Sequence, residues 1–310
     1  MNLSDRSKLI KREAGNHGFD FCGISKAEFL ENEAPRLEKW LKKKYHGQMG
    51  YMENYFDKRL DPTKLVPGSK SVVSLLYNYS PKEILPEKES IISRYAYGTD
   101  YHFVIKDKLK DLADALKDQI GNFHGRVFVD SAPVMERQWA ERAGIGWIGK
   151  HTLLINRQSG SYFFLAEMIV DLELEPDGPI KDYCGSCTRC IDACPTNAIS
   201  DHQVNASKCI SYLNIELKES IPKEFKGQME NRLFGCDICQ EVCPWNRFAT
   251  PHREPRFEPS EELRQMNAND WKELTREVFQ ERFKNSALKR KGFDGIKDTV
   301  RFISQKKTLH

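Results

Sequence analysis

The chain has 310 residues, of which 39% are hydrophobic and 30% charged, and this length and balance suit a globular protein with a true core and room for two domains. No run approaches the roughly 18 apolar residues of a membrane span, and residues 2–13 are polar and charged, unlike an export signal. We therefore expect a cytoplasmic protein, and a net charge of +3 permits an anionic partner without requiring one.

The first part of the chain mixes helical and extended patterns. Apolar residues recur at helical spacing over 3–15, 34–44 and 103–120. Short apolar runs at 20–24 and 71–77 predict strands. The isolated Cys22 in the first strand is interpreted as a small core residue. These patterns predict an α/β or α+β domain.

An acidic residue ends the next predicted strand, residues 127–129, in the sequence Asp130-Ser-Ala-Pro133. In α/β folds, working groups often follow a core strand. Alternatively, Asp130 is the N-cap of a helix over 134–143. Arg59, in a loop before an earlier strand, is either a ligand-binding cation or a solvated charge.

Three glycines follow in the sequence Gly144-Ile-Gly146-Trp-Ile-Gly149. The spacing is not a dinucleotide-binding signature, because it follows a predicted helix and leads into a strand. Residues 152–155 and 162–174 are predicted to form a hairpin of core strands.

Eight of the nine cysteines fall between positions 184 and 243. The first run, from Cys184 to Pro195, has the C-x2-C-x2-C-x3-C-P spacing of bacterial ferredoxins, in which the cysteine before proline ligates the other cluster. We therefore predict two [4Fe–4S] clusters. The predicted ligands of the first are Cys184, Cys187, Cys190 and Cys243, and those of the second are Cys194, Cys209, Cys236 and Cys239.

Two other uses of cysteine fit less well. Zinc ribbons use two pairs of ligands and do not need two Cys-Pro endings. Disulfides require an oxidising compartment, which the polar N-terminal residues do not indicate.

Beyond position 250 the chain predicts helices near 261–264 and 271–283. This segment is basic, and its cations form either a solvated face or a patch that contacts phosphates. They are Lys284, Lys289, Arg290, Lys291, Lys297, Lys306 and Lys307.

Several motifs together resemble the epoxyqueuosine reductase family over residues 58–246. They are Lys58-Arg59, Gly98-x-Asp-Tyr-His102, Val129-Asp130, Ala140-Glu-Arg-Ala-Gly-Ile-Gly146, Gly160-Ser-Tyr162, Leu165-Ala-Glu-Met168, the cysteine run, Cys209-Ile-Ser211 and Asn231-Arg-Leu-Phe-Gly-Cys-Asp237.

The resemblance implies an α/β (α+β) cobalamin-binding domain like that of reductive dehalogenases over 1–178. A ferredoxin-like domain with two [4Fe–4S] clusters is expected over 179–250. A short helical basic tail follows over 251–310, without the helical-repeat module of longer members. The sequence has no Asp-x-His-x-x-Gly signature, in keeping with a family that binds cobalamin without a histidine lower ligand.

The resemblance also implies roles for single residues. Asp130 matches the family's proposed proton donor, and burial against the corrin is expected to keep it protonated. Predicted cobalamin contacts are Arg59, Asp130, Leu154, Leu165, Met168, Ser211 and Asp237. Ser93 occupies a position where some members have a cysteine.

The implied activity is reduction of epoxyqueuosine to queuosine at the wobble position of tRNA. Electrons would come from an external low-potential carrier of the flavodoxin or ferredoxin type, and a monomer is expected. The alternatives are a reductive dehalogenase-like enzyme and a non-catalytic two-cluster electron carrier.

Overall fold

The computed structural model describes residues 1–86 and 90–305. Its N-terminal part is built on one sheet of four strands in the order β1-β2-β7-β4. Each neighbouring pair in this sheet is antiparallel, so the domain is of the α+β kind. The strands are β1 (Phe21–Lys26), β2 (Ser71–Asn78), β4 (Gly125–Phe128) and β7 (Phe163–Val170).

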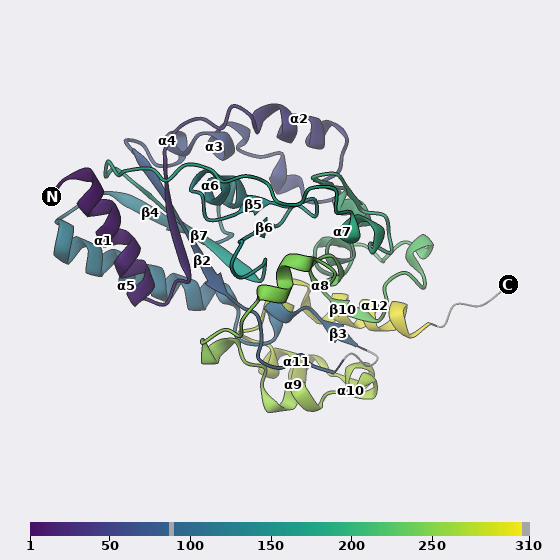
Figure 1. Ribbon diagram of the computed structural model, residues 1–310. Coiled ribbons are helices and arrows are strands. Elements are labelled where there is room, and N and C mark those ends of the chain that lie inside the picture. The colour runs from purple at the N-terminus through teal and green to yellow at the C-terminus, as the bar shows by residue number, and fades with distance from the viewer. Residues whose placement is uncertain (87–89, 306–310) are drawn as a thin grey trace.

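Helices cover both faces of the sheet (Figure 1). On one face lie α1 (Leu3–Asn16) and α5 (Tyr101–Ile120). The other face is covered by α2 (Ala34–Lys42), α3 (Phe56–Leu60), α4 (Pro62–Leu65) and α6 (Glu136–Arg142). Because side chains alternate along a strand, Val73 packs in the cluster with α5 and Val72 in the cluster with α6. The central strand β2 is therefore buried along its whole length.

The cysteine-bearing segment is tied to the first part of the chain by strand pairing and side-chain contacts. Strand β10 (Arg232–Phe234) pairs in parallel with β3 (Ile91–Ile92). The Trp40 indole donates to the Val204 carbonyl at 2.7 Å. The segment's other elements are α7 (Arg189–Asp192), β8 (Ile199–Ser200), β9 (Gln203–Val204) and α8 (Ile238–Glu241).

The C-terminal helices form part of the folded body. Ile92 of β3, Phe234 of β10, Trp271 and Ile296 share one buried cluster. The predicted helices near 261–264 and 271–283 correspond to α9 (Glu261–Gln265), α10 (Ala268–Glu273) and α11 (Arg276–Arg282), and α12 (Gly292–Ser304) follows.

Three cations of the basic segment are engaged within the protein. Arg290 pairs with Glu216 at 3.0 Å. Lys291 donates to the Leu217 carbonyl at 2.5 Å, and Lys297 donates to the Leu274 carbonyl at 3.2 Å. The structure therefore gives these three side chains a structural use, whereas Lys306 and Lys307 lie outside the described residues.

Short helical turns connect these elements. A π-helical turn covers Tyr212–Glu216, and 3-10 turns lie at Gly50–Met52, Arg94–Ala96, Ala206–Lys208, Lys223–Phe225, Pro244–Phe248, Pro255–Phe257 and Ala287–Arg290. Within residues 1–86 and 90–305, no helix combines the length and the apolar character needed to cross a bilayer.

Two local predictions were wrong. The hairpin expected from 152–155 and 162–174 does not form, because β6 (Leu154–Ile155) pairs with β5 (Trp147–Ile148), whereas β7 pairs with β2 and β4. An apolar run shows that a strand will be buried but does not select its partner.

The interpretations of Asp130 from strand topology and helix capping also need correction. The sheet is antiparallel, so the rule for the carboxyl ends of parallel strands does not apply. The residue preceding α6 is Met135, with no side-chain cap, so Asp130 is not the N-cap either.

Candidate active site

Four of the predicted ligand cysteines gather in a first group, formed where the run at 184–190 meets the turn after α8. Burial, followed by the charges of Cys243 and Cys184, raises the pKa of the Cys190 thiol to about 11. Burial also raises the pKa of Cys243, and the charges of Cys184 and Cys187 add to that shift. The charges of Cys184, Cys187 and Cys243 thus act on the buried members of the group, which places the four thiols near one another.

The other four cysteines form a second group. Burial raises the pKa of Cys236 to about 12, and the neighbouring Cys209 adds to the shift. Burial raises the pKa of Cys239 well above its ordinary value, and the charges of Cys236 and Cys209 add to that shift. Burial raises the pKa of Cys209, and the charge of Cys194 adds to that shift. The Cys194 sulfur also accepts the Ala198 N–H at 3.3 Å.

These thiols suit a cationic cluster. Cysteine binds metal as the thiolate, so crowded thiols with raised pKa values need positive charge between them. The Trp147 indole N–H is buried without a hydrogen-bond partner of ordinary geometry. Burial raises the pKa of Cys184 and this indole opposes the shift, so an unused donor lies beside a ligand sulfur. No three His, Cys, Asp or Glu side chains in the described parts of the chain converge on one point as the ligands of a single ion do.

The two groups differ in depth. Around the first, Gly185 and Ser186 are exposed and Cys184 is half-buried. Around the second, Gly235, Asp237 and Ile238 are buried. The surroundings of the first, outer group are therefore more exposed than those of the second, inner group, although Cys190 and Cys243 of the outer group are themselves buried.

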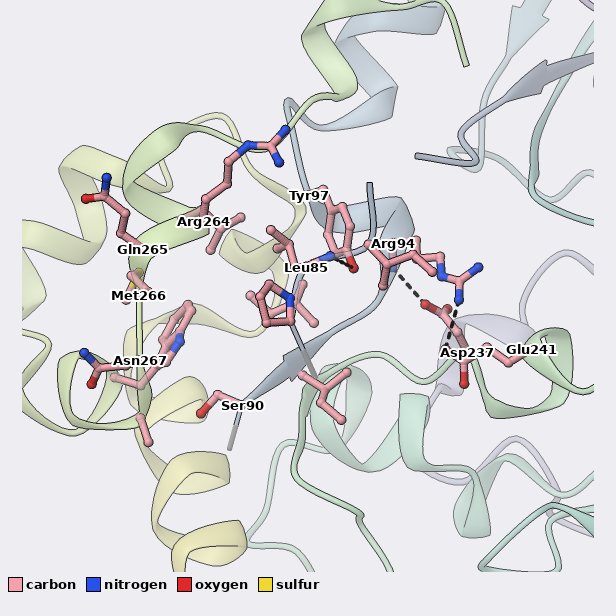
Figure 2. Close-up of a pocket in the computed structure, with 17 residues that line it drawn as sticks. Leu85, Ser90, Arg94, Tyr97, Asp237, Glu241, Arg264, Gln265, Met266 and Asn267 are labelled. Atoms are coloured by element: carbon pink, nitrogen blue, oxygen red, sulfur yellow. Dashed lines mark hydrogen bonds and ion pairs between the residues drawn. The ribbon is translucent and has the colours of Figure 1, made fainter. Parts of the chain in front are cut away.

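Asp237 joins the second group to the first part of the chain. Its side chain is 4% exposed and accepts the Arg94 N–H at 2.9 Å (Figure 2). The pocket drawn there, which Trp271 also lines, holds about 70 Å³, far less than the several hundred Å³ of a cofactor site. Asp237 is therefore a contact between two segments, and this pocket is not a corrin site.

Asp130 stands in a strained turn after β4, with φ of +43°, a conformation that is uncommon for residues other than glycine. Its Oδ2 accepts the Tyr101 hydroxyl at 2.6 Å, and its N–H donates to Oε1 of Glu136 at 2.6 Å. The Tyr101 ring stacks on Phe164 of β7, with centroids 4.2 Å apart. Asp130 is exposed, so the protein itself does not supply the burial that we expected.

Arg59 lies on α3, and its side chain is mostly buried. It donates to the carbonyls of Asn54 at 3.2 Å and Tyr51 at 2.6 Å, and a guanidinium has five N–H donors. Burial raises the pKa of Tyr51, and the charges of Glu216, Arg290, Asp130 and Arg59 also act on it. Charged groups from four separate positions in the chain therefore lie near enough to Tyr51 to act on its ionisation.

The apolar positions predicted to contact cobalamin do not share one face. Leu154 and Leu165 pack in the same small cluster, whereas Met168 is 2% exposed and packs in the core with α5. Positions 165 and 168 are three apart on a strand, which puts them on opposite faces. Met168 is thus separated from the other two by the sheet itself.

Ser211 lies against the second thiol group. Burial raises the pKa of Cys209, whereas the backbone of Tyr212 and both the backbone and the hydroxyl of Ser211 oppose the shift. The structure thus gives Ser211 a contact with a predicted cluster ligand. Hydrogen bonds of this kind tune a metal site.

Two glutamates near Asp130 were not predicted from the sequence. Glu136 begins α6, and Glu167 is completely buried in the middle of β7. Glu167 has a signal in the sequence, since an acidic residue inside the apolar run Phe-Phe-Leu-Ala-Glu-Met-Ile-Val is costly unless it is used. Glu136 has none, because helices often begin with an acidic residue.

The fold and the two thiol groups define a two-cluster iron–sulfur oxidoreductase. Comparison with known families agrees, since residues 183–246 match the family described as a 4Fe-4S double cluster binding domain. Residues 59–131 match the family described as epoxyqueuosine reductase QueG, DUF1730. The cluster prediction is confirmed, and zinc and disulfides are set aside.

Relatives extend the match to nearly the whole chain. An epoxyqueuosine reductase from Leadbetterella byssophila is 60% identical, over 98% of this chain and 100% of the relative. The Escherichia coli enzyme is 40% identical, over 94% and 79%. A crystal structure of epoxyqueuosine reductase with a modified tRNA-Tyr stem loop superposes with a TM-score of 0.90 at 34% identity, covering 97% of this chain and 81% of that one. The chain belongs to the epoxyqueuosine reductase family.

Family membership covers the residues ahead of the cysteines as well as the cysteines themselves. The match to enzymes along 98% of the chain therefore overturns the alternative of a non-catalytic electron carrier. The same match also favours an epoxyqueuosine reductase over a dehalogenase-like enzyme.

Proposed function

We propose that this protein reduces epoxyqueuosine to queuosine at the wobble position of tRNA, using cobalamin that is reduced through the two clusters. The 60% identity to an epoxyqueuosine reductase along 98% of this chain carries this proposal, and it is supported by the hydrogen bond between Asp237 and the Arg94 N–H, which is 2.9 Å long. This hydrogen bond holds the second thiol group against the segment that leads through Tyr101 to Asp130. The stem loop bound in a solved relative supports tRNA as the substrate.

Each thiol group serves as one set of ligands in this proposal. Cys184, Cys187, Cys190 and Cys243 hold the outer cluster, and Cys194, Cys209, Cys236 and Cys239 hold the inner one. The grouping of their charges supports the assignment. Donors at the sulfurs, such as the Ala198 N–H, adjust the potential of the inner cluster.

The residues around Asp130 suit a large polar cofactor. Arg59 keeps donors beyond its two carbonyl bonds, and the exposed Asp130 and nearly half-exposed Tyr51 lie among the same charges. Residues that would hold cobalamin are Arg59, Asp130, Leu154, Leu165 and Ser211. Met168 is left out because it packs beyond the sheet, and Asp237 because its buried side chain is used in the contact with Arg94. When bound, cobalamin supplies a strongly reducing metal that accepts electrons singly from clusters.

Asp130 provides the proton that the substrate needs. Opening an epoxide leaves negative charge on oxygen, and a positioned acid that protonates it contributes about 10²- to 10⁴-fold in rate. Tyr101 fixes the Asp130 carboxyl through its 2.6 Å bond, and Glu136 fixes the Asp130 backbone. A bound corrin and substrate would supply the burial that Asp130 lacks in the protein alone.

The outer thiol group offers a place for an electron donor. Tyr183 and Phe248 are 38% and 40% exposed, and Arg157 and Arg247 lie over their rings at 5.1 and 4.5 Å. An open groove beside Cys243 has a volume of about 860 Å³, and its charged lining residues are Arg94, Arg189 and Arg247 together with Asp192 and Glu241. We propose that an acidic flavodoxin or ferredoxin binds this basic and aromatic surface, because complementary charge speeds such encounters.

The deciding experiment uses protein loaded anaerobically with iron, sulfide and cobalamin. It is incubated with tRNA containing epoxyqueuosine and a chemical reductant, and the nucleosides are separated by mass spectrometry. Queuosine should accumulate. If the loaded protein leaves epoxyqueuosine unchanged, the proposed function is wrong; if it holds iron but takes up no cobalamin, the cofactor assignment is wrong.

We further propose that the protein is a monomer located in the cytoplasm. Sedimentation tests the oligomeric state, and cell fractionation tests the location.

A further inference from the structure

Glu167 is a carboxyl group without an ordinary partner in the middle of the sheet. Its residue has no exposed surface, and neither carboxyl oxygen makes a hydrogen bond of ordinary geometry. On the neighbouring strands its register partners are Ser74 and Phe128, and the Ser74 hydroxyl is also buried without a partner. A buried acid of this kind is strongly destabilising if it is charged, so we expect it to be protonated.

A second carboxyl, that of Glu136, faces Glu167 from the start of α6. Of all groups, Glu136 acts most strongly on the ionisation of Glu167, and Asp130 acts next. Glu136 in turn accepts the Asp130 N–H at 2.6 Å. Carboxyl groups from β7 and α6 thus lie close to each other and to the exposed Asp130 at the end of β4.

The surrounding charges do not neutralise this pair. Burial raises the pKa of Glu167 well above its ordinary value, and the charges of Glu136 and Asp130 add to the shift. Burial and the charge of Asp130 also raise the pKa of Glu136, while the cation of Arg137 opposes the shift. Arg137 also donates to the Thr152 carbonyl at 2.6 Å, and the Tyr101 hydroxyl donates to Asp130. A buried carboxyl next to a half-buried one, both with raised pKa values, holds a proton between the two groups.

The proposed reaction needs more protons than one carboxyl carries. An epoxide that takes up two electrons and two protons gives an alkene and one water. Asp130 carries one proton at a time, and the electrons come from the external donor. A second proton must therefore reach the same oxygen within each turnover.

We propose that Glu136 and Glu167 share a stored proton that recharges Asp130, so that Asp130 delivers both protons of the reduction. This inference rests on the proposed function. Asp130 gives its first proton to the oxygen as the ring opens, and its carboxylate then takes the stored proton after turning from Tyr101 toward Glu136. The second transfer releases the oxygen as water, and solvent returns one proton to the pair and one to Asp130.

The first test asks whether the proton is present, and it requires no turnover. Infrared difference spectra of the loaded protein between pH 6 and pH 9 should show a protonated carboxyl that persists above neutral pH and shifts in heavy water. Glu167→Gln and Glu136→Gln should each remove it. The control is Glu141→Gln, also on α6, whose carboxyl accepts the Ile148 N–H at 3.1 Å. A wild-type protein without this band overturns the proposal.

The second test measures kcat against pH with tRNA containing epoxyqueuosine. Each pair variant should lower kcat about 10- to 100-fold, below the range of a directly acting acid, and leave KM unchanged. The pH at which kcat declines on the alkaline side should also move. Glu141→Gln should behave as wild type in both respects. Unchanged kcat and pH profiles in both pair variants would refute the stored proton while leaving the proposed function intact.

The two tests also separate the inference from the function beneath it. If the wild type converts no epoxyqueuosine, the proposed function fails, and the infrared result still shows whether the pair holds a proton. Gln has nearly the size of a protonated Glu, so both variants should fold. Should Glu167→Gln fail to fold, Glu136→Gln, at the half-buried start of a helix, carries both tests.

Discussion

The cysteine segment and the acid site around Asp130 are built in opposite ways. Most of the cluster ligands come from two short runs with spacings of two or three residues, so local turns place them. The acid site takes Asp130 from the turn after β4, Glu136 from α6 and Glu167 from β7, and only the pairing of β4 with β7 brings them together. A set of ligands that local turns place can be recognised in a sequence. A set of carboxyl groups that strand pairing brings together cannot.

Of the changes that test this contrast, removing a cluster ligand should have the largest effect on iron content and turnover. Cys239→Ser should lose the inner cluster, so the iron content should fall from about eight atoms per chain toward four, and turnover should be abolished because electrons no longer reach the acid site. Iron analysis, electron paramagnetic resonance and nucleoside analysis measure this.

Cys22→Ser is the matched control, because Cys22 packs against the apolar core of the first part of the chain. It should keep both clusters and full activity. Loss of iron in this variant, or full iron in Cys239→Ser, would contradict the ligand assignment.

Asp130→Asn should have the next largest effect. It keeps the size and shape of the side chain but removes its acid, so turnover should fall about 10²- to 10⁴-fold while iron and cobalamin binding persist. Asp171→Asn, which changes a carboxylate that accepts the His124 N–H at 2.9 Å, should leave turnover unchanged. Near-normal turnover in Asp130→Asn would remove this residue from the proton-donor role.

The proposed donor surface should respond more weakly. Reversing charge with Arg157→Glu and Arg247→Glu together should raise the KM for a flavodoxin about 3- to 30-fold, because charge complementarity acts mainly on encounter. Turnover with dithionite should not change, since a small reductant needs no docking surface.

A second double variant, Lys8→Glu with Lys110→Glu, makes the same change in net charge at exposed positions on α1 and α5. Its KM should match that of the wild type. An equal rise in both variants would show that overall charge, rather than this surface, governs the encounter.

The smallest effect concerns stability. The pKa of Glu167 is raised in the folded state, so the folded protein binds more protons than the unfolded chain above about pH 4.3, the ordinary glutamate value. Stability should therefore decline as pH rises, by up to about 1.4 kcal/mol per pH unit for one proton. Glu167→Gln should flatten this decline in melting temperatures measured from pH 5 to pH 8. A decline of equal steepness in the variant would place the titrating group elsewhere.

The sequence by itself determined most of the elements and the iron–sulfur chemistry. Predicted strands at 20–24 and 71–77 and the helix at 103–120 correspond to β1, β2 and α5. Periodic apolar residues and short cysteine spacings are local properties, so they can be recognised without knowledge of the fold. Asp130 was also identified from the sequence, although the strand-end reason given for it does not hold in an antiparallel sheet.

The tertiary structure alone decided which distant residues meet. It paired β7 with β2 and β4 rather than with residues 152–155, and it used three cations of the C-terminal segment within the protein. It also set Glu136 and Glu167 behind Asp130. Strand partners and the faces of a sheet depend on contacts between residues far apart in the chain, and no local pattern records them.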